Sequence, residues 1–135
     1  MRLVELLRLL RFGAVGLLAA AVHYWVVIGL VELLRIQPLQ ANFGGFAVAF
    51  WVSYFGHRYW TFANPEGAGV AASFMRFLAI AVSGFCLNEL LFYLFLRYLE
   101  LPYYVALGIV VLIVAVMTYV LSRWWAFRVQ PVSHG

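Results

Sequence analysis

The stretch S-Y-F-G-H-R-Y-W-T-F, residues 53–62, decides the fold, because it returns 65 residues later as T-Y-V-L-S-R-W-W-A-F, residues 118–127. Both copies close a long apolar run with the same order of tyrosine, arginine, tryptophan and phenylalanine. An Arg-Phe pair also opens each half, at residues 11–12 and 76–77, and the two halves align without a gap. Self-similarity at a fixed offset indicates that one structural unit is present twice.

The composition indicates that this unit lies in a membrane. Hydrophobic residues make up 67% of the 135 residues and charged residues only 10%, whereas a soluble domain has roughly 25% charged residues. Four apolar runs have the length of about 20 residues that a transmembrane helix needs; they are residues 12–31, 41–60, 77–96 and 103–121. We therefore expect an all-α integral membrane protein of four transmembrane helices. It forms one domain, residues 1–135, with two-helix repeats over about 8–62 and about 73–127.

The arginines predict the orientation. All nine basic residues are arginines, and seven of them belong to the two termini and the middle loop, namely Arg2, Arg8, Arg11, Arg58, Arg76, Arg123 and Arg128. Only Arg35 and Arg97 belong to the other side. This positive-inside bias puts both termini in the cytoplasm. Each repeat has an even number of spans, so both copies enter from the same side as a parallel repeat. The net charge of +4 then reflects topology and anionic lipid, and we expect no nucleic-acid partner.

Small residues recur every four positions in the second predicted span, at Ala41, Gly45, Ala49 and Ser53. In lipid, small residues mark the places where helices approach closely. The corresponding stripe in the fourth span is bulkier: Ala106, Val110, Val114 and Thr118. We interpret both stripes as helix packing and expect the second span to be the more deeply packed.

Two polar residues stand at matching positions inside the spans. His23 lies 12 residues after Arg11, which is about 18 Å along a helix, and Asn88 has the same spacing from Arg76. Small residues precede each of them on its own face, so the two faces are predicted to meet at the pseudo-two-fold axis. Polar groups inside a bilayer need a partner or a purpose. The pair is equally compatible with an interhelical hydrogen bond and with contact to a substrate.

Glu89 is an acid well inside the third span, and its counterpart in the first repeat is Tyr24. It is compatible with a proton-coupling carboxylate, with a partner for His23, or with a side chain that reaches an outer cavity about 12 Å from Arg97. Asn42 is predicted to open the second span at the outer face, as a headgroup contact or an N-terminal cap.

Four arginines at the predicted cytoplasmic helix ends are related by the repeat: Arg11, Arg58, Arg76 and Arg123. Guanidinium groups bind phosphate in a bidentate manner, so the four are candidates for a lipid phosphate, next to His57 and Ser122. Taken singly, each is also explained as a topology anchor. The chain contains no P-loop, no metal-spaced His/Cys cluster and no acidic pair for a metal-bound sugar nucleotide. We expect no enzyme activity, no catalytic residue, no metal and no cofactor.

These motifs resemble the GtrA-like family of small bacterial membrane proteins. The resemblance is carried by Arg11-Phe12 with Val15-Gly16 and His23, by the second-span pattern that ends in His57-Arg58-x-Trp60-Thr61-Phe62, and by the closing Ser122-Arg123-x-Trp125-x-Phe127. It extends from about residue 11 to about residue 128. It implies a multi-pass protein of the bacterial inner membrane that flips a polyprenyl-phosphate-linked sugar, typically undecaprenyl-phosphate glucose, for modification of cell-surface polysaccharide. Glu89 does not match the family pattern.

Under this hypothesis the arginines collect the phosphate, and polar side chains in the spans replace water around the sugar hydroxyls: His23, Ser53, Asn88 and Glu89. Four helices are few to enclose such a path, so we expect a homo-oligomer or a partner glycosyltransferase among membrane lipids. Two alternatives remain. One is a scaffold that anchors a polyprenyl-phosphate glycosyltransferase without transport. The other is a small multidrug-type exporter, which ranks last because such exporters commonly carry their acid in the first span and have weak orientation bias.

Overall fold

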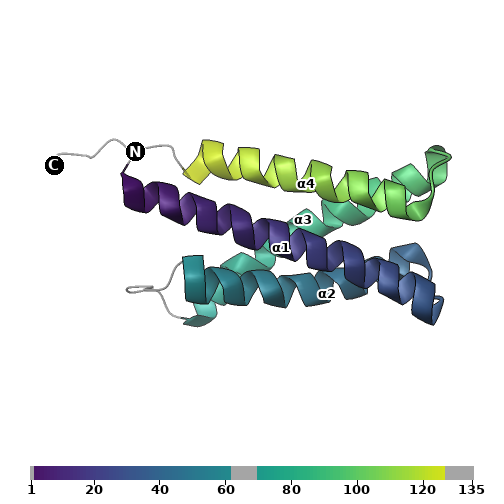
Figure 1. Ribbon diagram of the computed structural model, residues 1–135, viewed down its shortest axis with the longest axis horizontal. Coiled ribbons are helices and arrows are strands. Elements are labelled where there is room, and N and C mark those ends of the chain that lie inside the picture. Colours follow the sequence, from purple (N-terminus) through teal and green to yellow (C-terminus); the bar gives the residue numbers. More distant parts are fainter. Residues whose placement is uncertain (1, 62–69, 127–135) are drawn as a thin grey trace.

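The computed structural model describes residues 2–61 and 70–126 of the chain, and the secondary structure of these residues is entirely helical. The elements in order are α1 (Leu3–Leu34), α2 (Pro38–Gly56), the short π-helix η1 (His57–Thr61), α3 (Val70–Tyr98) and α4 (Tyr103–Ala126) (Figure 1). Each predicted span lies within one of these helices, except that the second is divided between α2 and η1.

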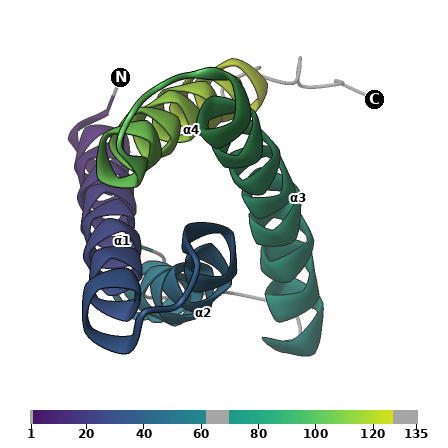
Figure 2. The ribbon, with the colours of Figure 1, turned by 90° about the vertical axis from the view of Figure 1, so that its right-hand side faces the viewer.

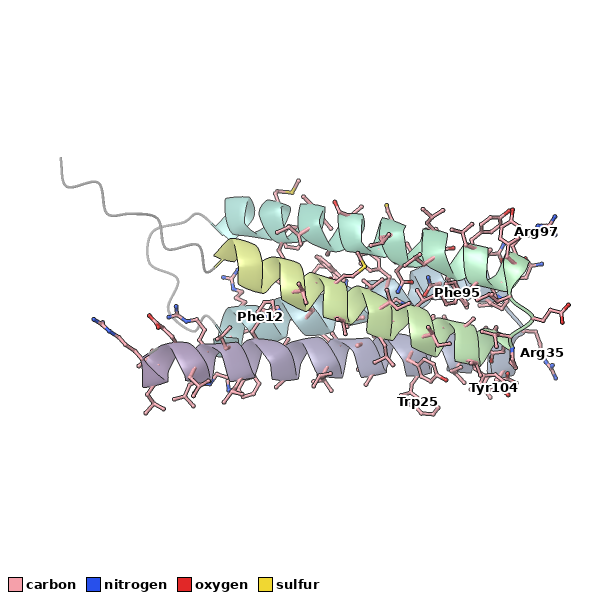
Figure 3. The ribbon with its side chains drawn as sticks, turned by 90° about the horizontal axis from the view of Figure 1, so that it is seen from above. Phe12, Trp25, Arg35, Phe95, Arg97 and Tyr104 are labelled. Carbon is pink, nitrogen blue, oxygen red and sulfur yellow. The ribbon has the colours of Figure 1, made fainter. Side chains whose placement is uncertain are left out.

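The four long helices run alternately in opposite directions, so that α1 and α3 begin at the end of the bundle where α2 and α4 finish (Figure 1). Seen end-on, they form a ring in which each helix contacts its two neighbours in the chain order, with α4 closing against α1 (Figure 2). The two arginines predicted on the outer side, Arg35 and Arg97, both lie at the end opposite Phe12 (Figure 3). The fold therefore places Arg35 and Arg97 at one end of the bundle and Phe12 at the other (Figure 3). The arginine distribution predicts the same division.

Two helices among the described residues are long and apolar enough to cross a membrane by length and composition, Leu3–Leu34 and Phe77–Tyr98. The apolar part of α4, Tyr103–Thr118, is shorter. The four-span arrangement and the cytoplasmic placement of the termini remain predictions.

The closest packing in the bundle joins α1 to α2. A side chain added at Gly45 would place its Cβ 2.5 Å from Val27 Cγ2 and 2.8 Å from the carbonyl oxygen of His23. Only glycine allows this approach. Ala41 and Ala49 of the same stripe are buried as well, so the prediction that this stripe packs a helix is confirmed.

The second stripe, on α4, packs over only part of its length. Ala106 and Val110 are fully buried, Val114 is half-buried and Thr118 is exposed. The buried residues of α4 join Val27 and other side chains of the core, which lies towards the α1–α2 connection: Val27, Ala41, Phe92, Ala106, Leu107 and Val110. The two repeats therefore pack unequally, as their stripes predict.

Candidate functional site

Four polar side chains from three helices meet inside the bundle. His23 comes from α1, Asn42 from α2, and Asn88 and Glu89 from α3. We call these four residues the polar cluster. His23 and Asn88 are buried, Asn42 has no exposed surface, and Glu89 is half-buried. The cluster therefore has a closed interior and one accessible edge, which Glu89 provides.

The amide of Asn42 joins the other three members. Its Oδ1 lies 2.6 Å from His23 Nε2, and its Nδ2 donates to Asn88 Oδ1 at 2.9 Å and to Glu89 Oε2 at 2.6 Å. An amide oxygen only accepts, so His23 donates from Nε2. Both amide hydrogens of Asn42 and its oxygen are thus used in one arrangement. No buried side-chain nitrogen or oxygen among the described residues lacks a hydrogen-bond partner.

The cluster corrects one sequence prediction and removes two of the alternatives that the sequence left open. Asn42 is not an N-terminal cap at the outer face: α2 begins at Pro38 after the cap residue Gln37, which puts Asn42 inside the helix. His23 and Asn88 do not bond to each other, because α1 and α3 stand on opposite sides of the ring (Figure 2). Glu89 likewise bonds to Asn42 and not to His23.

Two of the small residues that precede His23 and Asn88 on their faces, Gly16 and Gly84, do not pack against another helix. A Cβ added at Gly16 or at Gly84 would meet no atom within 4 Å. The matched polar residues therefore share a partner on α2, and no direct α1–α3 interface forms around them. The start of α2 at Pro38 was the signal for this, since proline favours the first turn of a helix.

A second group of candidate residues gathers at the other end of the bundle, where α2 passes into η1. Arg58 Nη1 donates to Tyr54 Oη at 2.9 Å, and its guanidinium stands 5.6 Å from the ring of Tyr59. Arg11 of α1 donates to the carbonyl oxygen of Trp60 at 3.4 Å and stands 5.7 Å from that indole. We call Arg11, Arg58 and their aromatic partners the arginine end. π-helical turns such as η1 occur frequently at functional sites.

Arg11 and Arg58 both lie at η1: Arg58 belongs to it, and Arg11 contacts its Trp60. The sequence repeat predicts such a grouping of two arginines in the first half of the chain. The side chains of Arg76 and Arg123 lie outside the described residues. His57 is buried and stacks on Phe12, with ring centroids 4.7 Å apart, so it supports the contact between η1 and α1. The aromatic partners were missed, although Tyr54 and Tyr119 keep the same spacing of four residues from Arg58 and Arg123.

The polar cluster and the arginine end are separate. Arg11 and His23 are about 18 Å apart along α1, and Asn42 and Arg58 roughly 24 Å apart along α2. Ser53, which was grouped with the polar cluster, lies 11 residues beyond Asn42, or about 16 Å along the helix, and does not join it. Among the described residues no group of three His, Cys, Asp or Glu is placed to hold a metal ion.

Comparison with known proteins gives one match. Residues 11–127 match the model of the family described as the GtrA/DPMS transmembrane domain. No curated protein and no solved structure matches the chain.

Proposed function

Because the chain belongs to the GtrA/DPMS transmembrane domain family, we propose that it moves a polyprenyl-phosphate-linked sugar across the bilayer. Family membership ties the chain to membrane functions that involve polyprenyl-phosphate sugars. The proposal adds the movement itself, its direction outward from the cytoplasm of a bacterium, and its use in modifying cell-surface polysaccharide.

The observation that carries the proposal is the polar cluster. A carboxyl group and three other polar side chains in the spans are costly in hydrocarbon, where a charge at the helix centre costs about 2.5–3.5 kcal/mol on insertion scales. In a protein that only anchors a glycosyltransferase, such a cluster would serve helix packing alone. A headgroup that crosses the bilayer has a use for it, because its hydroxyls need hydrogen-bond partners in place of water.

The arginine end supports the first step, capture of the phosphate. Arg11 is exposed, and Arg58 is half-buried against tyrosine rings that hold its guanidinium in place. A polyprenyl phosphodiester carries one negative charge at headgroup depth, and guanidinium groups bind such phosphates strongly. The prenyl tail stays in lipid throughout, so only the sugar phosphate needs a polar route.

The route runs from the arginine end to the polar cluster. Its length of roughly 20 Å along the helices exceeds the reach of one sugar phosphate, so the headgroup occupies the two places in succession. An inside-negative membrane potential favours outward movement of a monoanion by about 2.3 kcal/mol per 100 mV. We expect a second copy of the chain or a partner glycosyltransferase to complete the wall of this route.

The test uses purified protein in vesicles that carry a polyprenyl-phosphate sugar with a labelled headgroup. The double variant Arg11→Ala/Arg58→Ala is expected to slow transbilayer movement of the label at least tenfold. The matched control is Arg35→Ala/Arg97→Ala, which removes two arginines from the opposite end of the bundle and leaves the rate within about twofold, since these arginines lie far from the phosphate site.

Equal slowing by both double variants would contradict a phosphate site at the arginine end. The scaffold alternative has a distinct outcome: a polyprenyl-phosphate glycosyltransferase co-purifies with the chain, while the labelled lipid moves no faster than in vesicles without protein.

A further inference from the structure

Apart from His57 and Arg58 at the arginine end, the four spans contain one imidazole and one carboxyl. They are His23 in α1 and Glu89 in α3; α2 from Pro38 to Gly56 and the stretch 103–121 contain no Asp, Glu, Lys, Arg or His. The fold brings this one imidazole and this one carboxyl to the two ends of the same amide, that of Asn42. Such a meeting does not follow from the duplication, because Leu107 occupies the position of Asn42 in the second repeat.

No positive charge touches Glu89 among the residues that the structure describes. Its hydrogen-bond partner is the neutral Nδ2 of Asn42, at 2.6 Å from Oε2. The titratable group that α1 contributes to the cluster is His23, which bonds to the other end of the Asn42 amide. Tyr24 of α1 donates to the carbonyl of Tyr104 at 3.1 Å, and α3 itself adds Cys86 and Tyr93. α4 contributes only tyrosines within its apolar part. A carboxylate without a cation is costly inside a membrane, and a bound proton removes its charge.

Glu89 is the least buried member of the polar cluster. Asn42 has no exposed surface, whereas Glu89 is half-buried at the accessible edge of the polar cluster. Asn42 occupies one carboxyl oxygen and leaves the other for a further ligand. An ionised carboxylate only accepts hydrogen bonds. The free oxygen therefore takes either a proton, in a new O–H bond, or the hydroxyl hydrogen of a sugar.

We propose that Glu89 is a proton-binding site whose occupancy alternates with that of the sugar headgroup, so that outward movement of the lipid is exchanged for inward movement of a proton. This inference rests on the proposed function. The proton enters Glu89 from the outer side and forms an O–H bond there. It leaves towards the cytoplasm when that bond breaks, and the ionised carboxylate then accepts the next headgroup. Asn42, His23 and Asn88 are positioning residues that hold the carboxyl.

The experiment measures the steady distribution of labelled polyprenyl-phosphate sugar in vesicles whose membrane potential is clamped at zero. With one proton exchanged per lipid, a gradient of about one pH unit changes the ratio between the leaflets about tenfold in the wild type. Glu89→Gln resembles the protonated carboxyl permanently and should remove this response, giving the same ratio with and without the gradient. Glu89→Asp keeps a carboxyl and should retain the response.

Tyr24→Phe is the matched control, because Tyr24 occupies the same position in the first repeat and donates to a backbone carbonyl. It should respond to the gradient as the wild type does. A tenfold response that persists in Glu89→Gln would overturn the proposal, as would a wild type whose lipid distribution ignores the gradient while the lipid still moves.

Infrared difference spectra of the purified protein supply a readout that needs no transport. The carboxyl C=O band of Glu89, identified by its loss in Glu89→Gln, should appear on acidification and should weaken when the polyprenyl-phosphate sugar is added at constant pH. A band that does not respond to pH contradicts the proton site. If the wild type moves no lipid at all, the proposed function fails, and a band that still titrates would separate that failure from the failure of the proton site.

Discussion

The two repeats differ in how closely their helices pack and in which polar residues they contribute. In the first, α2 lies so close to α1 that Gly45 has no room for a methyl group. In the second, α3 and α4 contact each other less closely, and Gly84 faces open space. Asn42 is replaced by Leu107 in the second copy, and Tyr24 by Glu89. The first repeat thus supplies a rigid pair of helices with a central amide, and the second supplies the carboxyl.

This difference explains why a duplicated unit gives a site that is not symmetric. A symmetric pair of polar faces would meet at the axis, where two buried groups satisfy each other and present nothing to a ligand. Here the amide of Asn42 provides hydrogen-bond partners for the buried His23 and Asn88. Glu89 remains half-buried at the edge of the cluster. The unshared residues are therefore the ones that we expect to act on the substrate.

The largest predicted effect concerns the tight packing of the first repeat. Gly45→Ala forces a methyl group to within 2.8 Å of a backbone oxygen that cannot turn away. We expect this change to lower the free energy of unfolding in detergent by up to about 3 kcal/mol, the upper range for overpacking.

The matched control for this change is Gly84→Ala in α3, which adds the same methyl group where no atom lies within 4 Å. Its free energy of unfolding should stay at the wild-type value or rise slightly, because alanine favours a helix over glycine by about 1 kcal/mol. Equal destabilisation by the two variants would contradict the unequal packing of the repeats.

The next effect concerns the central amide. Asn42→Leu introduces the residue that the second repeat has at this position and removes three hydrogen bonds from buried or half-buried groups. We expect a loss of about 1–3 kcal/mol in unfolding free energy, since groups left without a partner keep their desolvation cost. Transbilayer movement of the labelled lipid should fall with it.

Ser53→Ala on the same helix is the control for Asn42→Leu, because Ser53 lies outside the polar cluster. Chemical denaturation measures the unfolding free energy of both variants, and Asn42→Leu should be the less stable of the two. A stability of Asn42→Leu equal to that of Ser53→Ala would mean that the amide does not hold the cluster together.

The smallest effect concerns the contact between the repeats at the end of the bundle opposite the arginine end. Tyr103 Oη donates to Glu32 Oε1 at 2.5 Å and so joins α4 to α1. Both residues are near the surface, so Tyr103→Phe should cost less than about 1 kcal/mol in unfolding free energy. Tyr104→Phe is the control, because Tyr104 takes part through its backbone carbonyl. A larger loss in Tyr104→Phe would contradict this assignment.

Much of the fold could be predicted from the sequence, since apolar length fixes a helix in lipid and the repeat fixes its register. The fourth predicted span and α4 even share the first residue, Tyr103. The neighbours of each helix could not be predicted, because matching faces on α1 and α3 do not reveal that the ring places these helices apart. Only the contacts of Gly45 with Val27 and His23 show which helix lies closest to α1.

The site was predictable in its members but not in its connections. Polar residues inside a span are recognisable in the sequence because their transfer into lipid costs free energy. His23, Asn88 and Glu89 were predicted for this reason. The role of Asn42 depended on four residues of helix before it, which begin at Pro38. At the arginine end, charge and spacing indicated Arg11 and Arg58, whereas their aromatic partners depend on how α2 turns into η1.

The most direct test of the account is the rate at which wild-type protein moves a polyprenyl-phosphate-linked sugar between the leaflets of reconstituted vesicles. The headgroup is labelled, and the labelled lipid that becomes accessible on the opposite leaflet is followed over time. Movement that rises in proportion to the amount of protein, well above the rate in vesicles without protein, is the result that we predict. Equal rates in loaded and protein-free vesicles would contradict the claim that the chain carries this lipid.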